Sequence, residues 1–174
     1  MCNKKECGQA KEKLYERFEF RYIRPEEAEQ AARIEQVCFP PNEACTEKMM
    51  KDRAAAVPEL FLVAVDRQNG QLGGFLCGLA TDESRFRDEF FYDNTLYRPQ
   101  GKNVILLGLD VLPEYRGQGL ARELMHVYLQ RKKNGEERWR SSPAWRIRSQ
   151  CMKKWDLPIM ACPSPPGEAY RGMK

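Results

Sequence analysis

Val111-Leu-Pro-Glu-Tyr-Arg-Gly-Gln-Gly-Leu-Ala121 is the stretch that decides the fold of this 174-residue chain. The apolar residues 104–109 precede it, and a segment with helical apolar periodicity follows it. This order predicts a strand, a tight turn and a helix. Two glycines flank Gln118, so main-chain amides there can face outward with no side chain in the way. Because the first amides of a helix are unpaired and its amino end is positive, we expect the turn to bind phosphate.

The spacing of the glycines limits which phosphate ligand fits. A dinucleotide fingerprint needs a third glycine, where this chain has Arg122, and an acidic residue closing a second strand. A P-loop needs Gly-Lys followed by Ser or Thr, and the chain has no such motif. A glycine-rich turn without any ligand is the alternative interpretation.

The pattern that does fit is V-x-P-x-x-R-G-x-G-x-A over residues 111–121, which resembles the acetyl-coenzyme A signature of the GNAT N-acetyltransferase superfamily. The resemblance covers about residues 18–133. It implies an α/β (α+β) GNAT fold, in which helices flank a mixed central sheet. It also implies acetyl-CoA as co-substrate and transfer of the acetyl group to a primary amine of a small molecule.

Residues in several loops narrow the resemblance to the serotonin (arylalkylamine) N-acetyltransferase branch. They lie in segments 20–28, 39–45, 58–60 and 96–101. The animal enzymes of this branch place two histidines on the strand before the glycine turn to relay a proton. The matching positions here are Ile105 and Leu107, which cannot carry a proton. The chain therefore differs from this branch at the residues that would form the proton relay.

Hydrophobic patterns predict the remaining elements. We expect a strand at 18–22; a helix from Pro25 to about Cys38 that buries Ala28, Ala31, Ile34 and Val37; and a second helix capped by Thr46 and ending before Pro58. Strands at 60–65 and 72–80, joined by an Asn-Gly hairpin, come next, then an irregular segment at 81–100 with a helical turn near 84–91. The strand at 104–111 and a helix from the glycine turn to about Lys132 complete the series.

Composition excludes several classes of protein. No apolar run approaches membrane-spanning length, and the polar N-terminus lacks the apolar core of a secretory signal. Seven cysteines form no C-x-x-C pair and His126 is the single histidine, so we expect no metal site. An odd cysteine count without a signal fits a reducing compartment. We therefore expect a cytoplasmic monomer or homodimer with no membrane partner, in which Cys38 and Cys77 are small core residues.

The net charge of +4 arises entirely in the C-terminal forty residues. Residues 1–134 hold 21 basic and 21 acidic side chains, whereas residues 135–174 hold 8 and 4. That tail also carries all three Trp and five of the 11 Pro. We divide the chain into a polar N-terminal extension (1–17), an incomplete GNAT domain (18–134) and an aberrant tail (135–174). The tail's Arg and Trp residues offer one alternative, a nucleic-acid-binding module. The electrically neutral main body provides no second basic patch, so we expect no nucleic-acid partner.

The tail has neither helical nor strand periodicity, which suggests that it is translated out of frame. The genetic code allows a test of this idea. If the DNA encoding residues 151–157 is read in a frame that begins at the third base of each codon, it can encode Tyr-Glu-Lys-Met-Gly-Phe. This sequence is similar to a second conserved GNAT motif. Met and Trp each have a single codon, so the bases at these positions are known and fix several residues of the shifted sequence. In this interpretation the chain as written lacks the fifth strand and the helix after it. The family's general-acid tyrosine would fall at Cys151, so this chain is expected to be impaired. A catalytically inactive acyl-CoA-binding protein is a further alternative.

The resemblance also assigns site residues. Those expected to bind the cofactor are Leu109, Asp110, Val111, Arg116, Gly117, Gln118, Gly119, Leu120 and Ala121. The main chain of the first three would pair with the pantetheine arm. The amides of the others would hold the pyrophosphate, with Arg116 adding a charge-assisted contact.

The reaction also needs a group that removes a proton from the amine. An alkylamine has a pKa near ~10, so its deprotonation costs ~4 kcal/mol at neutral pH unless a base assists. Asp110 and Glu35 are the candidate bases, acting through water, although a carboxylate in such a place is more often a surface or capping group. Glu43, Asp88 and Glu89 lie in loops where the family binds acceptors, and they would suit a cationic amine or simply face solvent.

Overall fold

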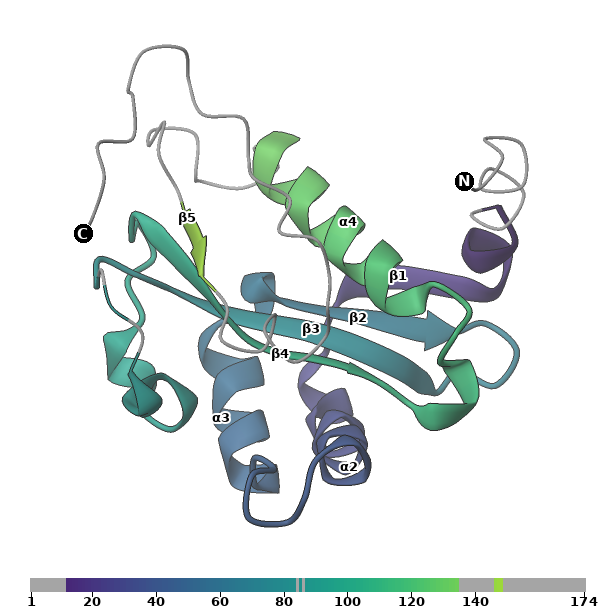
Figure 1. Cartoon of the computed structure of the whole chain (residues 1–174), viewed down its shortest axis with the longest axis horizontal. Coiled ribbons are helices and arrows are strands. Elements are labelled where there is room, and N and C mark those ends of the chain that lie inside the picture. The colour runs from purple at the N-terminus through teal and green to yellow at the C-terminus, as the bar shows by residue number, and fades with distance from the viewer. Residues whose placement is uncertain (1–11, 84, 86, 135–145, 149–174) are drawn as a thin grey trace, which may run out of the picture.

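Five strands form one sheet in the order β1-β2-β3-β4-β5 in the computed structural model (Figure 1). The structure describes residues 12–83, 85, 87–134 and 146–148. Strands β1 to β4 are antiparallel to their neighbours, and β5 runs parallel to β4. The elements are β1 (Phe18–Tyr22), η1 (Pro25–Glu27), α2 (Ala28–Cys38), α3 (Glu47–Ala56), η2 (Pro58–Leu60), β2 (Phe61–Asp66), β3 (Leu72–Thr81), η3 (Asp88–Phe91), η4 (Asn94–Leu96), β4 (Asn103–Val111), η5 (Pro113–Tyr115), α4 (Leu120–Asn134) and β5 (Arg146–Arg148).

Helices cover both faces of the sheet, with α2 and α3 on one face and α4 on the other (Figure 1). Because side chains alternate along a strand, β2 and β3 supply apolar residues to both layers, and every residue of both strands is buried. Val63, Phe75 and Cys77 pack towards α2 and α3, whereas Leu62 and Leu76 pack towards α4. The predicted α/β GNAT-type arrangement of a sheet flanked by helices is confirmed.

The helices begin and end close to the predicted residues. A short η1 turn at Pro25 leads into α2, which ends at Cys38 as expected. Ala28, Ala31 and Ile34 are buried, but the prediction for Val37 is wrong, because 56% of its surface is exposed. Ala32 is buried in the same helix, so the inward face of α2 is centred on the alanines and on Ile34.

Local signals in the first half of the chain also hold. Thr46 caps α3 by accepting a hydrogen bond from the amide of Met49 at 3.2 Å. Gly70 has a φ of +70° in the turn between β2 and β3, which confirms the Asn-Gly hairpin. The segment after Thr81 is mostly irregular and contains the short turns η3 and η4.

A bulge in β4 decides which side chains face which helix layer. Cys77 pairs with Gly108, but Gly78 pairs with Leu106, so Leu107 is the extra residue. Before the bulge, Ile105 and Leu107 face α2 and α3. After it, Gly108 lies on that same face, because a Cβ added there would sit 3.4 Å from the Cys77 sulfur and 3.1 Å from Asp110 Oδ2. The bulge therefore turns Asp110 towards α2.

The N-terminal segment contains structure that the sequence did not predict. Residues 12–17 are helical. Tyr15 packs on Phe20 with ring centroids 5.2 Å apart, and its hydroxyl donates to Glu123 Oε1 at 2.6 Å. These residues therefore pack against the sheet and α4, although composition alone places them in an extension.

The expectation that the written chain lacks a fifth strand is also wrong. β5 pairs with the first three residues of β4, from Asn103 to Ile105. Its sequence, Arg-Ile-Arg, has a single apolar residue. Such a short segment shows no alternation of apolar and polar residues, so the hydrophobic pattern did not predict this strand. The rest of the tail lies outside the described residues, as do Cys151 and most of the basic–aromatic residues. Among the residues that are described, no helix is long and apolar enough to cross a membrane.

Candidate functional site

The glycine turn between β4 and α4 presents unpaired main-chain amides at the surface. Gly117 and Gly119 have φ values of +73° and +88°, a region that other residues adopt only with strain. Gln118 is exposed, and its side chain bends back to donate to the Glu114 carbonyl at 2.9 Å. A Cβ added to Gly117 would meet no atom within 4 Å, so the space beside this turn is open.

The amides of this turn form the amino end of α4, a helix of fifteen residues. The amide of Glu123 donates to the Gly119 carbonyl at 3.0 Å. Within the described part of the chain, the amides from Gly117 to Ala121 donate no hydrogen bond. The amide of Arg116 donates to Pro113 at 3.2 Å, so the set of available donors begins one residue later than predicted. Unpaired amides at the positive end of a helix suit an anion.

The side chain of Arg116 lies across the end of β4 rather than over the turn. Its Nε donates to the Val111 carbonyl at 2.9 Å, and its Nη2 lies 3.3 Å from the Cys38 sulfur. Nε and Nη2 are therefore already engaged, and the predicted contact with a phosphate could use these two nitrogens only if the guanidinium left these partners. The structure thus brings Arg116, Val111 and Cys38 together, a grouping that the sequence did not indicate.

The outer edge of β4 offers main-chain hydrogen-bonding groups next to this turn. The amide of Leu112 donates to Gly73 of β3 at 3.0 Å, so the carbonyl of Val111 points away from β3. The N–H and C=O of one residue in a strand face the same side, and the sides alternate, so Leu109 also faces outward. Among the described strands, β5 pairs with β4 only at its start. Figure 1 shows β4 continuing past β5 towards the glycine turn.

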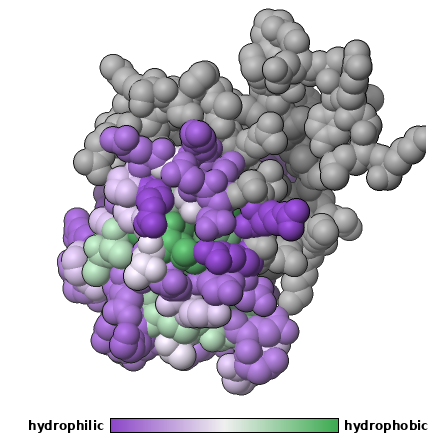
Figure 2. Space-filling view, turned by 90° about the vertical axis from the view of Figure 1, so that its left-hand side faces the viewer, coloured by the Kyte–Doolittle hydropathy of each residue, from purple (hydrophilic) through white to green (hydrophobic). Residues whose placement is uncertain are grey.

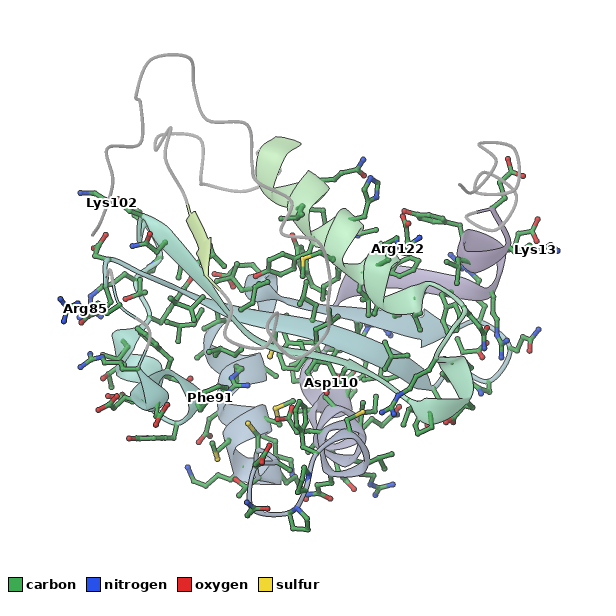
Figure 3. The ribbon with its side chains drawn as sticks, in the orientation of Figure 1. Lys13, Arg85, Phe91, Lys102, Asp110 and Arg122 are labelled. Carbon is green, nitrogen blue, oxygen red and sulfur yellow. The ribbon has the colours of Figure 1, made fainter. Side chains whose placement is uncertain are left out.

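The two predicted carboxylates lie close together in the layer between the sheet and α2. Asp110 is 1% exposed and Glu35 is 6% exposed. Figure 3 shows Asp110 on the side of the sheet that faces α2. Within the described residues, neither carboxylate oxygen of Asp110 accepts a hydrogen bond, and Glu35 uses only Oε1, which accepts from the Cys45 amide at 3.3 Å. Burial, followed by repulsion from Glu35, raises the pKa of Asp110 to about 8.

Arg53 is a buried cation beside this acidic pair, and sequence reasoning did not identify it. It is 1% exposed, and its Nη2 donates to the Phe91 carbonyl at 2.7 Å, which ties α3 to η3. Its Nη1 lies 3.5 Å from the Cys77 sulfur. Burial alone would lower the pKa of Arg53, but Cys77, Cys45 and Glu35 raise it. Nothing in the polar sequence of α3 marks this arginine as buried.

The other residues named from the sequence lie away from the acidic pair or at the surface. Glu43 and Asp88 are exposed, and Glu89 is partly buried. His126 is on α4, across the sheet from Asp110, with Nδ1 3.2 Å from Glu123 Oε1. Cys77 is fully buried as predicted, and burial raises its pKa to about 12.

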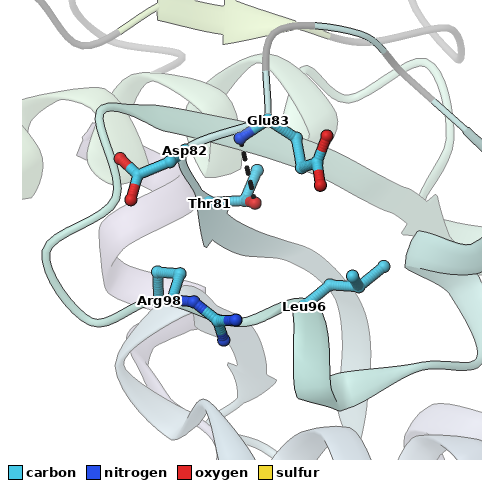
Figure 4. Close-up of a pocket in the computed structure, with 5 residues that line it drawn as sticks. All are labelled: Thr81, Asp82, Glu83, Leu96 and Arg98. Carbon is cyan, nitrogen blue, oxygen red and sulfur yellow. Dashed lines mark hydrogen bonds between the residues drawn. The ribbon is translucent and has the colours of Figure 1, made fainter.

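A separate pocket of about 300 Å³ lies at the end of the sheet opposite the glycine turn (Figure 4). It is lined by Thr81, Asp82, Glu83, Leu96 and Arg98. Figure 2 views this end of the molecule and shows a small apolar area surrounded by polar side chains. No group of three or more His, Cys, Asp or Glu residues could hold a metal ion in the described part of the chain.

These features agree with the comparisons. Residues 28–139 match the acetyltransferase (GNAT) family, which is more than half of the chain, so the chain belongs to this family. No curated protein matches the sequence.

Three solved structures share the fold at 18–19% identity. The GphF GNAT-like decarboxylase in complex with isobutyryl-CoA aligns with a TM-score of 0.62, over 75% of this chain and 64% of that one. The loading GNATL domain of CurA from Lyngbya majuscula gives 0.57, over 65% and 57%. Arabidopsis thaliana Naa50, in complex with the bisubstrate analogue CoA-Ac-MVNAL, gives 0.52, over 76% and 70%. The chain thus spans less than two thirds of the CurA and GphF chains.

Proposed function

We propose that this protein transfers the acetyl group of acetyl-CoA to the primary amine of a small molecule. The observation that carries the proposal is that the amides from Gly117 to Ala121 donate no hydrogen bond within the described residues, beside the part of β4 that β5 leaves unpaired there. Main-chain donors at a helix amino end suit the diphosphate of CoA. The family to which the chain belongs supports this ligand.

The residues present fit acyl-CoA in two places. The amides of the glycine turn would hold the diphosphate, and the outward groups of Leu109 and Val111 would pair with the pantetheine arm as an added strand does. The Val111 carbonyl already accepts from Arg116 Nε at 2.9 Å and from the Cys38 thiol at 3.5 Å, so pairing with the pantetheine arm would displace one of these donors. Acetyl-CoA, when bound, supplies an activated acyl thioester, and the proposal involves no metal.

Asp110 is our candidate for the base that removes the amine proton, directly or through water. A catalytic base works best when its pKa lies near the operating pH, and the pKa of Asp110 is raised to about 8. Glu35 would tune this base, because its charge is the second cause of the raised pKa. The proton would move from the amine nitrogen to a carboxylate oxygen of Asp110, and both of these oxygens lack a hydrogen-bond partner among the described residues.

We propose that the acceptor resembles the arylalkylamines used by the serotonin-type branch. Ile105 and Leu107 occupy the positions of the animal enzymes' histidines, and both are buried in the layer under α2 and α3. A proton relay through them is chemically excluded, so Asp110 would have to replace it. Small arylalkylamines are the first acceptors to test, followed by alkylamines and polyamines.

Two measurements test the proposed function on this chain. We expect acetyl-CoA to raise the melting temperature, by mass action on the folded state, and desulfo-CoA analogues with an intact diphosphate to do so as well. We also expect release of CoA thiol to depend on an added amine. A melting temperature that does not change at millimolar acetyl-CoA would contradict the proposal. Binding without thiol release from any amine would instead indicate a catalytically inactive acyl-CoA-binding protein.

We also infer that residues 135–174 are read out of frame, with the slip between about Lys132 and Arg140. The codons for Lys132-Lys133-Asn134 are adenine-rich, which suits a slip. Sequencing the DNA across this run in independent isolates should reveal a base gained or lost. The repaired protein would carry the family's tyrosine in place of Cys151, and we expect its thiol-release rate to exceed that of this chain. An intact frame in every isolate would remove this inference.

A further inference from the structure

A buried polar network joins the N-terminal segment to the glycine turn. Asp66, the last residue of β2, is 1% exposed. Its Oδ2 accepts hydrogen bonds from Arg17 Nη2 at 3.1 Å and from the Tyr115 hydroxyl at 3.0 Å, and its Oδ1 accepts from the Gln68 amide at 2.9 Å. Burial alone would raise the pKa of Asp66, but these donors hold it below its usual value.

Tyr115 is the member of this network that belongs to the turn. It ends η5 and directly precedes Arg116 and the two positive-φ glycines. Its ring packs edge-on against Phe18 with centroids 5.2 Å apart, and the Arg17 guanidinium lies 5.0 Å from its centroid. Gly73 makes room for the ring, because a Cβ there would lie 3.1 Å from Tyr115 Cδ2. Contacts on several sides therefore fix the position of Tyr115.

The same N-terminal segment also approaches the turn from the side of α4. A Cβ added at Gly119 would lie 3.8 Å from Leu14 Cδ1, the only contact within 4 Å that the described residues would make with it. Tyr15 is hydrogen-bonded to Glu123, in the first turn of α4. Residues 12–17 thus contact Tyr115, which precedes the glycine turn, and Glu123 in the first turn of α4, which follows it (Figure 1).

We propose that Arg17, Asp66 and Tyr115 are positioning residues for the acyl-CoA site, which hold the glycine turn in the conformation that binds the diphosphate. The proposal rests on the proposed function. None of the three residues needs to touch the ligand. They act by fixing the main chain at Tyr115, two residues before Gly117, so that the unpaired amides of the turn are preorganised.

Tyr115→Phe is the sharpest test, because it removes one hydroxyl and keeps the ring that packs on Phe18. We expect the KM for acetyl-CoA to rise about three- to tenfold, as for the loss of a hydrogen bond to a charged group, with kcat at saturation unchanged. Amide hydrogen exchange in residues 113–121 of the free protein should become faster. Tyr92→Phe, at a 63% exposed ring, is the matched control and should change neither value.

Arg17 provides a second arm of the experiment. Arg17→Met should reproduce the higher KM, and Arg17→Lys should restore part of the affinity by returning a charge beside Asp66. If wild-type protein binds acetyl-CoA and Tyr115→Phe binds it equally well, or if kcat falls while KM stays constant, this inference is wrong and the proposed function stands. If wild-type protein fails to bind acetyl-CoA, both are wrong. Unchanged exchange in Tyr115→Phe also overturns the inference.

Discussion

Asp110→Asn is expected to lower kcat for amine acetylation by about 100-fold or more, which is the usual contribution of a general base. The KM for acetyl-CoA should stay within about twofold, because the main chain of β4 is unchanged. In the wild type, kcat should rise with pH to a plateau above about 8, the pKa of Asp110. Asp52→Asn, at an exposed carboxylate on α3 paired with Lys48, is the matched control and should behave as the wild type.

Glu35→Gln separates the base from the residue that tunes it. Removal of the Glu35 charge takes away the second cause of the raised pKa, so the midpoint of the pH–rate profile should move to lower pH. Activity should remain. A profile that does not move would show that Glu35 has no influence on the base, and normal turnover by Asp110→Asn would eliminate Asp110 itself.

The same carboxyl also links stability to pH. Its pKa is raised to about 8 in the folded protein and lies near 3.8 in the unfolded chain, so unfolding releases a proton between these values. The stabilising effect of this group is complete below pH 4 and is lost as the pH rises towards 8. Its contribution falls by up to about 1.4 kcal/mol per pH unit. Denaturant titrations should show a flatter dependence on pH for Asp110→Asn.

Alanine at Gly117 and Gly119 together should weaken acetyl-CoA binding by at least about tenfold. Each glycine has a positive φ, and the left-handed region costs about 1–2 kcal/mol for a residue with a Cβ. The turn would relax, and its amides would no longer converge on one anion. Isothermal titration with acetyl-CoA measures the effect.

Gly70→Ala is the matched control for this double substitution. Gly70 has a similar φ of +70° and open space around its Cβ position, but it lies in the β2–β3 hairpin. It should lower the melting temperature and leave the affinity unchanged. Equal losses of affinity from both changes would indicate general destabilisation rather than a diphosphate site.

Local signals explain why so much of the fold was predictable. The glycine turn, the cap at Thr46 and the hairpin at Gly70 each depend on a few neighbouring residues, and the structure has all three. Helix α2 also ends at the predicted Cys38. Val37 was misplaced because the buried face of α2 is narrow and is centred on the alanines and Ile34, and periodicity does not report how far that face extends.

The site was less predictable because its key features arise from distant segments. The sequence placed Asp110 and Glu35 among the candidate bases, but it could not show that they lie together and buried. The partners of Arg116, the burial of Arg53 and the packing of residues 12–17 all depend on tertiary contacts. The three-residue β5 pairs with β4 across more than forty residues of sequence and carries no periodic signal.

The extra residue at Leu107 has a consequence for how this strand can change. Deletion of Leu107 would remove the bulge and restore simple alternation, with Asp110 still facing α2, because the residues on both sides of the bulge keep their partners on β3. If the strand lost its bulge without losing a residue, and residues 103–106 kept their pairing, Leu109 and Val111 would turn towards α2, and Asp110 would lie beneath α4, away from Glu35. A single-codon deletion at Leu107 would therefore preserve the two faces from Gly108 to Val111, whereas a change that abolished the bulge and kept every residue would exchange them in one step.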